Sequence, residues 1–257
     1  MKSSLIITTY NWSEALDLVL RSLTKQSIFP DEIIIADDGS RAETRTLITD
    51  FKHPLKHIWH EDTGFRKANI LNKAVASATG DYIIQIDGDC IMHPNFVADH
   101  LNSVKKGCYL YGSRVNIQEY YLPKLFKKKQ ITFNFFSKGI KKRTRAIYLP
   151  ILGKLYKTSN VFSKKYRGCN TSYFKSDFIS VNGYDEDFVG WGREDSELAI
   201  RFHNFGLKSR RLRYQGIVFH IYHKEKSKDR LEQNDAIEKM TINNKRIKTD
   251  RGISQYL

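Results

Sequence analysis

The strongest constraint on the fold is a strand–helix–strand pattern close to the N-terminus. Residues 4–9 and 32–36 are short apolar runs rich in β-branched side chains, which are typical of strands. Ser13 is placed to cap a helix between them. The apolar residues of that helix fall on one stripe, namely Leu16, Val19, Leu20 and Leu23. Because two strands joined by a helix pair in parallel, the pattern predicts a βαβ unit.

The same pattern occurs a second time further along the chain. Residues 57–59 are a short strand candidate, residues 66–79 have the apolar spacing of a helix, and residues 81–86 form the next strand. Gly80 separates that helix from that strand. Two consecutive units of this kind predict an α/β sandwich of the Rossmann type with a mostly parallel central sheet.

The remainder of the chain is less regular. Residues 106–167 alternate lysines with Tyr, Phe and Leu, which indicates an insertion of loops and short amphipathic helices. Beyond it we expect a helix at 176–181, a stronger helix from Glu194 and a strand within 216–222. The sequence thus predicts a single α/β domain made of four segments, namely 1–105, the basic insertion 106–167, 168–225 and a polar tail at 226–257.

The positive charge is concentrated in one stretch. Residues 101–167 contain 17 Lys and Arg but a single acid, Glu119, whereas the net charge of the whole chain is +15. The rest of the protein is therefore close to neutral. A basic excess in one block is typical of a surface that contacts something anionic, although a solvated face would have the same composition.

Aromatic residues lie between the densest basic clusters of this stretch. Lys127–Lys129 and Lys141–Arg143 flank Phe133, Phe135 and Phe136. Cations beside apolar rings are typical of a surface that binds an anionic leaflet with shallow insertion. We therefore expect peripheral binding to the inner face of the cytoplasmic membrane. Docking of a soluble anionic acceptor and an oligomer contact are the alternatives.

The N-terminus and the cysteines indicate the compartment. The first apolar run is too short for a signal peptide, and no later run approaches the roughly 18 apolar residues of a spanning helix. Cys90, Cys108 and Cys169 are odd in number and lack CxxC spacing. We therefore expect a cytoplasmic protein with reduced cysteines and no cysteine-based metal site.

Polar residues follow three of the predicted strands at the point where each strand ends. These residues are Thr8–Asn11, Asp37–Ser40 and Asp87–Asp89. The carboxyl ends of parallel strands meet at one edge, where open α/β sheets bind ligands, although each motif alone would also suit a capped turn. Asp87 and Asp89 offer the hard oxygen ligands that Mg²⁺ and Mn²⁺ prefer, and the sequence has no glycine-rich phosphate loop.

Several motifs taken together resemble a known family. TTYN, ADDGS, the segments Asp62–Asp89 and Gly168–Leu198, and a late histidine occur in the order typical of family 2 glycosyltransferases of the GT-A fold. The second half resembles the galactosyltransferase-like C-terminal module of chondroitin-polymerase-type enzymes. The likeness covers residues 3–110 and 168–223, and it includes neither the basic insertion nor the tail.

The resemblance implies a metal-dependent, inverting transfer of a sugar from a UDP-sugar to a glycan or lipid-linked glycan, as in polysaccharide or lipopolysaccharide biosynthesis. Segment 1–105 would bind the nucleotide sugar, and segment 168–225 would bind the acceptor. The implied nucleotide-sugar contacts are Thr8, Tyr10, Asn11, Asp38, Asp62, Arg66, Asn72, Asp87 and Gly88. Leu71 stands before Asn72 where many relatives have arginine.

The resemblance also implies which residues act on the acceptor. Asp195 would be the general base that removes the proton of the acceptor hydroxyl. The implied acceptor contacts are Trp191, Gly192, Glu194 and Asn170. The two acids would also be favoured simply as first-turn residues of a helix, and a structural role in a loop is equally open for Asn170.

The implied cofactor is Mn²⁺ or Mg²⁺. Asp89 would ligate it together with a late histidine, for which His223 is preferred over His220. Nucleic-acid binding is one alternative function. Acidic rather than basic residues gather at the strand ends, however, so we expect no nucleic acid among the partners. A sugar-nucleotide pyrophosphorylase is another, but it would need a glycine-rich, basic loop after the first strand.

Overall fold

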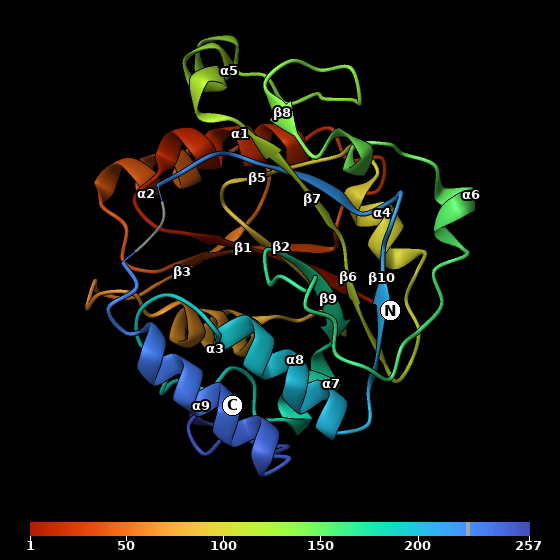
Figure 1. Ribbon diagram of the computed structural model, residues 1–257. Coiled ribbons are helices and arrows are strands. Elements are labelled where there is room, and N and C mark those ends of the chain that lie inside the picture. Colours follow the sequence, from red (N-terminus) through yellow and green to blue (C-terminus); the bar gives the residue numbers. More distant parts are fainter. Residues whose placement is uncertain (225–226) are drawn as a thin grey trace.

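A seven-stranded sheet forms the centre of the protein, in the order β10-β6-β9-β4-β1-β2-β3 (Figure 1). The computed structural model describes residues 1–224 and 227–257. All neighbouring strands pair in parallel except β9, which runs antiparallel to both β4 and β6. The strands are β1 (Ser3–Thr9), β2 (Glu32–Asp37), β3 (Lys56–Trp59), β4 (Tyr82–Asp87), β6 (Cys108–Tyr111), β9 (Asn170–Phe174) and β10 (Lys208–Arg211).

Helices cover both faces of this sheet because its strands are apolar on both sides. In β1, Leu5 and Ile7 pack towards α1, whereas Ile6 between them packs towards α3 and α8. One face is covered by α1 (Ser13–Leu23), α2 (Ala42–Thr49) and α4 (Phe96–Leu101), and the other by α3 (Lys67–Ser77), α7 (Lys175–Ser180) and α8 (Glu194–Asn204) (Figure 1). This arrangement confirms the expected α/β sandwich.

A second sheet of four strands lies beside α1, in the order β5-β11-β7-β8. Its strands are β5 (Cys90–Met92), β7 (Ser113–Ile117), β8 (Ile140–Lys141) and β11 (Ile217–His220). A third apolar core joins it to the helix, with Val115 and Phe219 packed against Ala15 and Leu18 of α1. The basic segment therefore supplies strands to both sheets.

The early strands and helices occur where the sequence predicts them, but the basic segment differs. Its short helices α5 (Leu122–Lys128) and α6 (Pro150–Gly153) agree with the expectation, whereas its strands β6 and β7 do not. Each of these two strands is short, since β6 is an apolar run of only four residues and β7 alternates buried and half-buried residues over only five. Phe133, expected at a membrane surface, is instead 5% exposed and stacks on Phe219. The expected cap is also wrong, since Ser13 is the first helical residue and Trp12 occupies the N-cap position.

The C-terminal segment is more than the polar tail that its composition indicates. It forms α9 (Leu231–Asn243), which packs on α8, and a short 3-10 helix (Ile253–Tyr256) that packs on α3 (Figure 1). Ile253 is fully buried in the core between α3 and α8. Within the described part of the chain, every helix is too short or too polar to cross a bilayer.

A buried ion pair within α8 is linked to α9 by a hydrogen bond. Arg201 donates to both carboxylate oxygens of Glu197 at 2.7 and 2.8 Å, and neither side chain is exposed to solvent. Arg201 also donates to the carbonyl of Val181, and Thr241 of α9 donates to Glu197. Because all these charged groups have partners, the pair sets the position of α8 without leaving a buried charge uncompensated.

Arg201→Met is expected to lower the free energy of unfolding by about 3–5 kcal/mol, because it leaves the Glu197 carboxylate buried without its partner. Arg21→Met is the matched control. Arg21 also pairs with an acid four residues away, Asp17, but on the surface, so its loss should cost less than about 1 kcal/mol. Urea unfolding followed by circular dichroism measures both changes. Equal losses in the two variants would contradict this account of α8.

Candidate functional site

Three strand ends meet at one edge of the central sheet, as the sequence predicts. Thr8 of β1 is paired with Asp87 of β4, and Thr9 with Asp37 of β2. The Thr8 hydroxyl donates to the Asp87 carboxylate at 2.9 Å. Gly88 follows without room for a side chain, since a Cβ there would lie 2.7 Å from the Thr8 carbonyl oxygen. The glycine is therefore required by the strand contact itself.

Lys67 at the start of α3 lies among the acids of this edge. Its ammonium is 2.9 Å from Asp87, and its charge also interacts with Glu194 and Asp195 of α8. Burial opposes the charge of Lys67, but these three acids raise its pKa well above the usual value. Burial likewise opposes the charge of Asp87, and Lys67 brings the pKa of that carboxyl below its usual value.

Lys67 is a functional candidate that the sequence reasoning missed. A signal for it exists, because a lysine at the first position of a helix faces the positive end of the helix dipole. Such a placement is unfavourable unless acids lie nearby. Here the acids come from β4 and from α8, which are far apart in the sequence.

Asp89, His220 and His223 form a group that fits a metal ion. One ligand atom from each lies within 4.8 Å of the others, and both histidine Nε2 atoms are 3.5 Å from the same oxygen of Asp89. With Nδ1 protonated, His223 donates to the Lys224 carbonyl at 2.8 Å, which leaves Nε2 as a free acceptor that faces Asp89. A carboxylate with two imidazoles suits Mn²⁺ and related divalent ions. The sequence analysis prefers His223 over His220, and the fold brings both histidines to Asp89.

The predicted nucleotide contacts form a connected loop cluster beside this edge. Tyr10 donates to Asp62 at 2.8 Å, and the residue is 41% exposed. Asp38 accepts from the backbone of Arg66 at 2.9 Å and is bonded to His60 at 2.7 Å. The hydrogen bonds of Asn11 go to Ser40 and Arg41, which join the loops after β1 and β2.

Two of the predicted contacts are buried, and for Asn72 the burial corrects the prediction. Asn72 is fully buried, and its amide donates to the Tyr184 carbonyl and to Glu186. Asn170 is 2% exposed, and its amide donates to the carbonyls of Ser113 and Gly216. Asn72 is held inside the protein, so it supports the fold rather than touches a substrate. Asn170 also lines a small pocket together with Ser113 and Arg114, so acceptor binding by Asn170 stays a prediction.

The loop 190–193 approaches the same site from the other side, and α9 holds it. Gly190, Gly192 and Arg193 all have positive φ angles, so the loop needs its glycines. Asn234 of α9 donates to the Gly192 carbonyl at 3.0 Å, and Arg193 is paired with Asp235. Trp191 remains 39% exposed at the tip of the loop. The C-terminal segment thus shapes this loop, which its composition does not indicate.

The two acids that follow this loop have different surroundings. Glu194 is 6% exposed and accepts from the Gly192 backbone at 3.1 Å, and burial followed by the charge of Asp195 raises its pKa to about 7. Asp195 accepts from the Gly168 backbone at 2.9 Å through Oδ2. Its Oδ1 is buried and accepts no hydrogen bond from the described residues. Gly168 lies so close that a Cβ there would be 2.0 Å from Oδ1.

Comparison with known proteins places this chain in a family. The model of glycosyl transferase family 2 matches residues 4–167, and that of the N-terminal domain of galactosyltransferase matches residues 156–224. The chain belongs to glycosyl transferase family 2. The first match includes the basic segment, residues 106–167. The resemblance based on motifs did not cover that segment.

Relatives of this family 2 glycosyltransferase include longer proteins. It is 28% identical to validoxylamine A glucosyltransferase of Streptomyces hygroscopicus subsp. limoneus over 79% of this chain and 48% of the relative. It is 26% identical to chondroitin synthase of Escherichia coli over 79% of this chain and 32% of the relative. The chain therefore spans half or less of the length of these relatives.

Solved structures share the GT-A fold of this family 2 glycosyltransferase. S. aureus TarS 1–349 in complex with UDP aligns over 100% of this chain and 68% of its own, with a TM-score of 0.67 and 16% identity. GalNAc-T7 with UDP, GalNAc and Mn²⁺ aligns over 88% of this chain and 44% of its own, with a TM-score of 0.62 and 19% identity. At these identities the likeness shows the fold.

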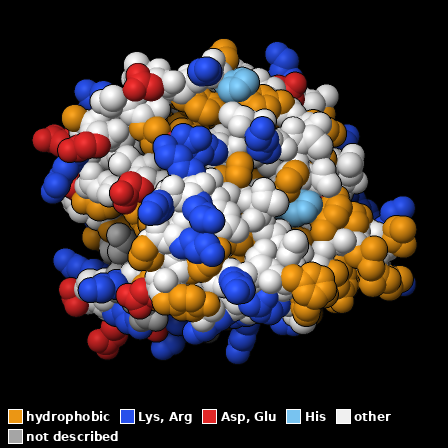
Figure 2. Space-filling view, turned by 90° about the horizontal axis from the view of Figure 1, so that it is seen from above, with side chains coloured by type: hydrophobic (Ala, Val, Ile, Leu, Met, Phe, Trp, Pro, Cys, Tyr) orange, Lys and Arg blue, Asp and Glu red, His pale blue; other side chains and the backbone are white. Residues whose placement is uncertain are grey.

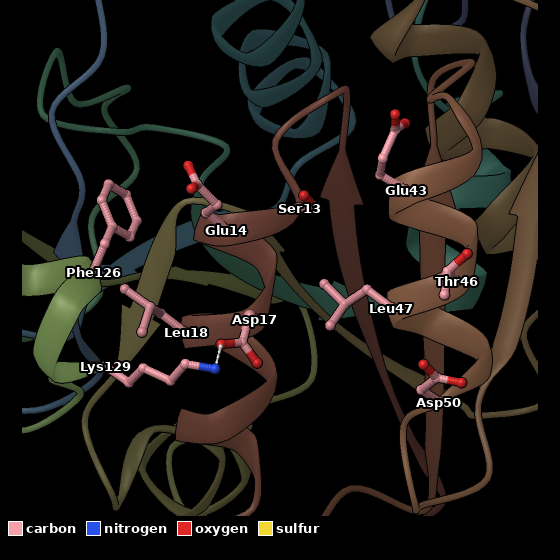
Figure 3. A pocket seen from close by; sticks show the side chains of 10 residues that line it. All are labelled: Ser13, Glu14, Asp17, Leu18, Glu43, Thr46, Leu47, Asp50, Phe126 and Lys129. Carbon is pink, nitrogen blue, oxygen red and sulfur yellow. Dashed lines mark ion pairs between the residues drawn. The ribbon is translucent and has the colours of Figure 1, made fainter.

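A groove of about 400 Å³ lies away from the candidate site of this family 2 glycosyltransferase, between α1, α2 and α5 (Figure 3). Four acids line it, namely Glu14, Asp17, Glu43 and Asp50, together with Lys129, which pairs with Asp17 at 3.4 Å. Carboxylates on both walls would repel a diphosphate. The groove is therefore unfavourable for a nucleotide because of its negative charge, although it is large enough to hold one.

Glu194→Gln is expected to stabilise the protein at pH 8 but not at pH 4. The pKa of Glu194 rises from 4.5 to about 7 on folding, so the folded state binds the proton more tightly and loses stability as pH rises between these values. The amide removes this loss, by on the order of 1–3 kcal/mol. Urea unfolding at both pH values measures it, with exposed Glu232→Gln as control. A pH-independent difference would contradict the assignment.

Proposed function

We propose that this chain transfers a sugar from a UDP-sugar to a glycan or lipid-linked glycan acceptor, with inversion at the anomeric carbon. The observation that carries the proposal is that Lys67 interacts with acids from two distant parts of the chain. The end of β4, with Asp87 and Asp89, lies on one side, and Glu194 and Asp195 at the start of α8 lie on the other. A donor site and an acceptor site would thus share one boundary.

On the donor side, we infer that Asp89, His220 and His223 hold Mn²⁺ or Mg²⁺. The ion would neutralise the charge of the donor diphosphate. Such a charge is needed, because Asp87, Glu194 and Asp195 outnumber Lys67 in the same region. The exposed ring of Tyr10, with Asn11, Asp38, Asp62 and Arg66, would surround the nucleotide. Thr8 would orient Asp87 through its 2.9 Å hydrogen bond.

On the acceptor side, we infer that Asp195 is the general base. Its unpaired Oδ1 is the free acceptor that an incoming hydroxyl needs, and Gly168 fixes its other oxygen. The acceptor oxygen would attack C1 of the donor as its proton passes to Asp195, and UDP would leave from the opposite face. Trp191 would stack on the acceptor sugar, and Glu194 would bind one of its hydroxyls.

Asp195→Asn is expected to reduce transfer at least 1,000-fold and to change the Kd for UDP less than twofold, because the base acts on the acceptor. Asp89→Ala should weaken Mn²⁺-dependent UDP binding at least tenfold. UDP release and calorimetry measure these effects, and NMR coupling constants should show a β-linked product from an α-linked donor.

Several results would contradict the proposal. Glu194, with a pKa of about 7, is the rival base, so loss of transfer in Glu194→Gln with activity kept in Asp195→Asn would exchange the two roles. Full activity of Asp89→Ala in EDTA would remove the metal. Retention of configuration would rule out a single displacement.

We also propose that the chain binds the inner face of the cytoplasmic membrane. Apolar side chains project from the basic segment, with Phe136 84%, Ile151 74% and Leu155 72% exposed. Figure 2 shows hydrophobic side chains gathered towards one edge of the upper face, with Lys and Arg side chains close by. Cations attract anionic headgroups at about 1 kcal/mol each, and the apolar groups would insert shallowly.

Replacing Lys127, Lys128 and Lys141 with Gln, together with Phe136→Ser, is expected to abolish flotation with anionic vesicles at 0.1 M salt, since screening at about this salt still permits attraction. UDP binding should stay unchanged, because these residues lie outside the donor site. The control removes three exposed lysines elsewhere, namely Lys25, Lys52 and Lys239. A wild-type protein that ignores anionic vesicles would overturn the membrane proposal.

A further inference from the structure

A small basic pocket lies next to the candidate acceptor side. It has a volume of about 130 Å³ and is lined by residues from β7, β9 and β10 and from the basic segment. Its charged side chains are all cationic, and no acid lines it among the described residues. They are Arg114, Lys142, Arg145, Lys164, Lys165, Arg167 and Arg211.

The pocket is built in two layers. Arg114, Arg145 and Arg211 are half-buried at its inner wall, whereas the lysines lie exposed at its rim. Arg145 is held in place by a 3.1 Å hydrogen bond to the carbonyl of Arg114. Ser113, which also lines the pocket, is 2% exposed, and its hydroxyl has no partner among the residues that the structure describes.

Repulsion between the cations of the pocket disfavours the charged forms of two of them. Burial, followed by the charges of neighbouring arginines, lowers the pKa of both Lys142 and Arg145. A solvated basic face would not concentrate arginines below its surface at this cost. An anion inside the pocket would relieve the repulsion.

The pocket is continuous with the catalytic groups proposed above. Arg167 and Cys169 of its lining flank Gly168, whose backbone amide donates to Asp195. Arg114 lies on β7, which pairs with β11 so that Asn116 lies opposite His220. The pocket therefore borders Gly168 and Asp195, and the charge of Arg114 also interacts with Asp89 and His220.

We propose that this pocket binds a phosphate group of the acceptor, so that the acceptor is a phosphate-bearing glycan or glycolipid. The inference rests on the proposed function for the identity of the acceptor. Three inner arginines favour phosphate, because guanidinium groups bind its oxygens in pairs and a dianion gains more than a carboxylate from several cations. The donor diphosphate is proposed to bind at Asp89, which is not among the residues that line the pocket.

The test uses the full chain with saturating UDP and Mg²⁺ at 0.15 M salt, and glycerol 3-phosphate, glycerate and glycerol as probes. Calorimetry should show saturable binding of glycerol 3-phosphate, at least tenfold tighter than that of glycerate and with no binding of glycerol. The double variant Arg145→Gln/Arg211→Gln should weaken this binding at least tenfold while the Kd for UDP stays within twofold.

Two further variants keep the result interpretable. Lys25→Gln/Lys239→Gln removes the same charge at exposed positions far from the pocket in sequence, and it should bind the phosphate probe normally. Lys164→Gln/Lys165→Gln changes only exposed rim residues, so it replaces the arginine variant if that variant misfolds, with a loss of at least threefold expected.

Four outcomes would overturn the proposal: no binding of glycerol 3-phosphate, binding of glycerate as tight as that of the phosphate, equal losses in the control variant, or competition between the probe and UDP. The last result would assign the pocket to the donor diphosphate. Failure of UDP itself to bind is a different result, because it would reject the proposed function. The binding of glycerol 3-phosphate would then be measured in the absence of nucleotide.

Discussion

The arrangement of the site depends on the ion pair between Lys67 and Asp87. Carboxylates from β4 and from α8 lie in one partly buried region, and they would repel each other without a cation between them. Lys67 supplies that cation from the start of α3, a helix whose apolar face packs under the central sheet. One side chain therefore connects the half of the chain that resembles a nucleotide-binding fold with the half that carries the loop 190–193.

Much of this fold could be predicted from local sequence. The strands β1, β2 and β4 are continuous apolar runs buried on both faces, and each is followed by a polar motif at the same edge of the sheet. Such runs are informative because a parallel strand buried on both sides needs apolar residues at every position. The convergence of Thr8, Asp37 and Asp87 then follows from topology alone.

The rest could not be predicted because its signals are non-local. Asn72 has the polarity of a ligand contact, and only the distant Tyr184 and Glu186 show that its hydrogen bonds are already made inside the protein. β7 carries polar side chains at positions 114 and 116, because Arg114 lines a pocket and Asn116 is only half-buried. The role of α9 was hidden for the same reason, since its contacts with Arg193 and Gly192 lie about 40 residues away in the sequence.

The contacts of α9 make the shape of the loop 190–193 independent of the pairing of the strands. The described strands of both sheets lie before residue 221, and they pair with one another without any residue of α9. The loop with Trp191, in contrast, obtains a hydrogen bond from Asn234 and an ion pair from Asp235. Local opening of α9 would therefore release this loop without breaking any of the strand pairings.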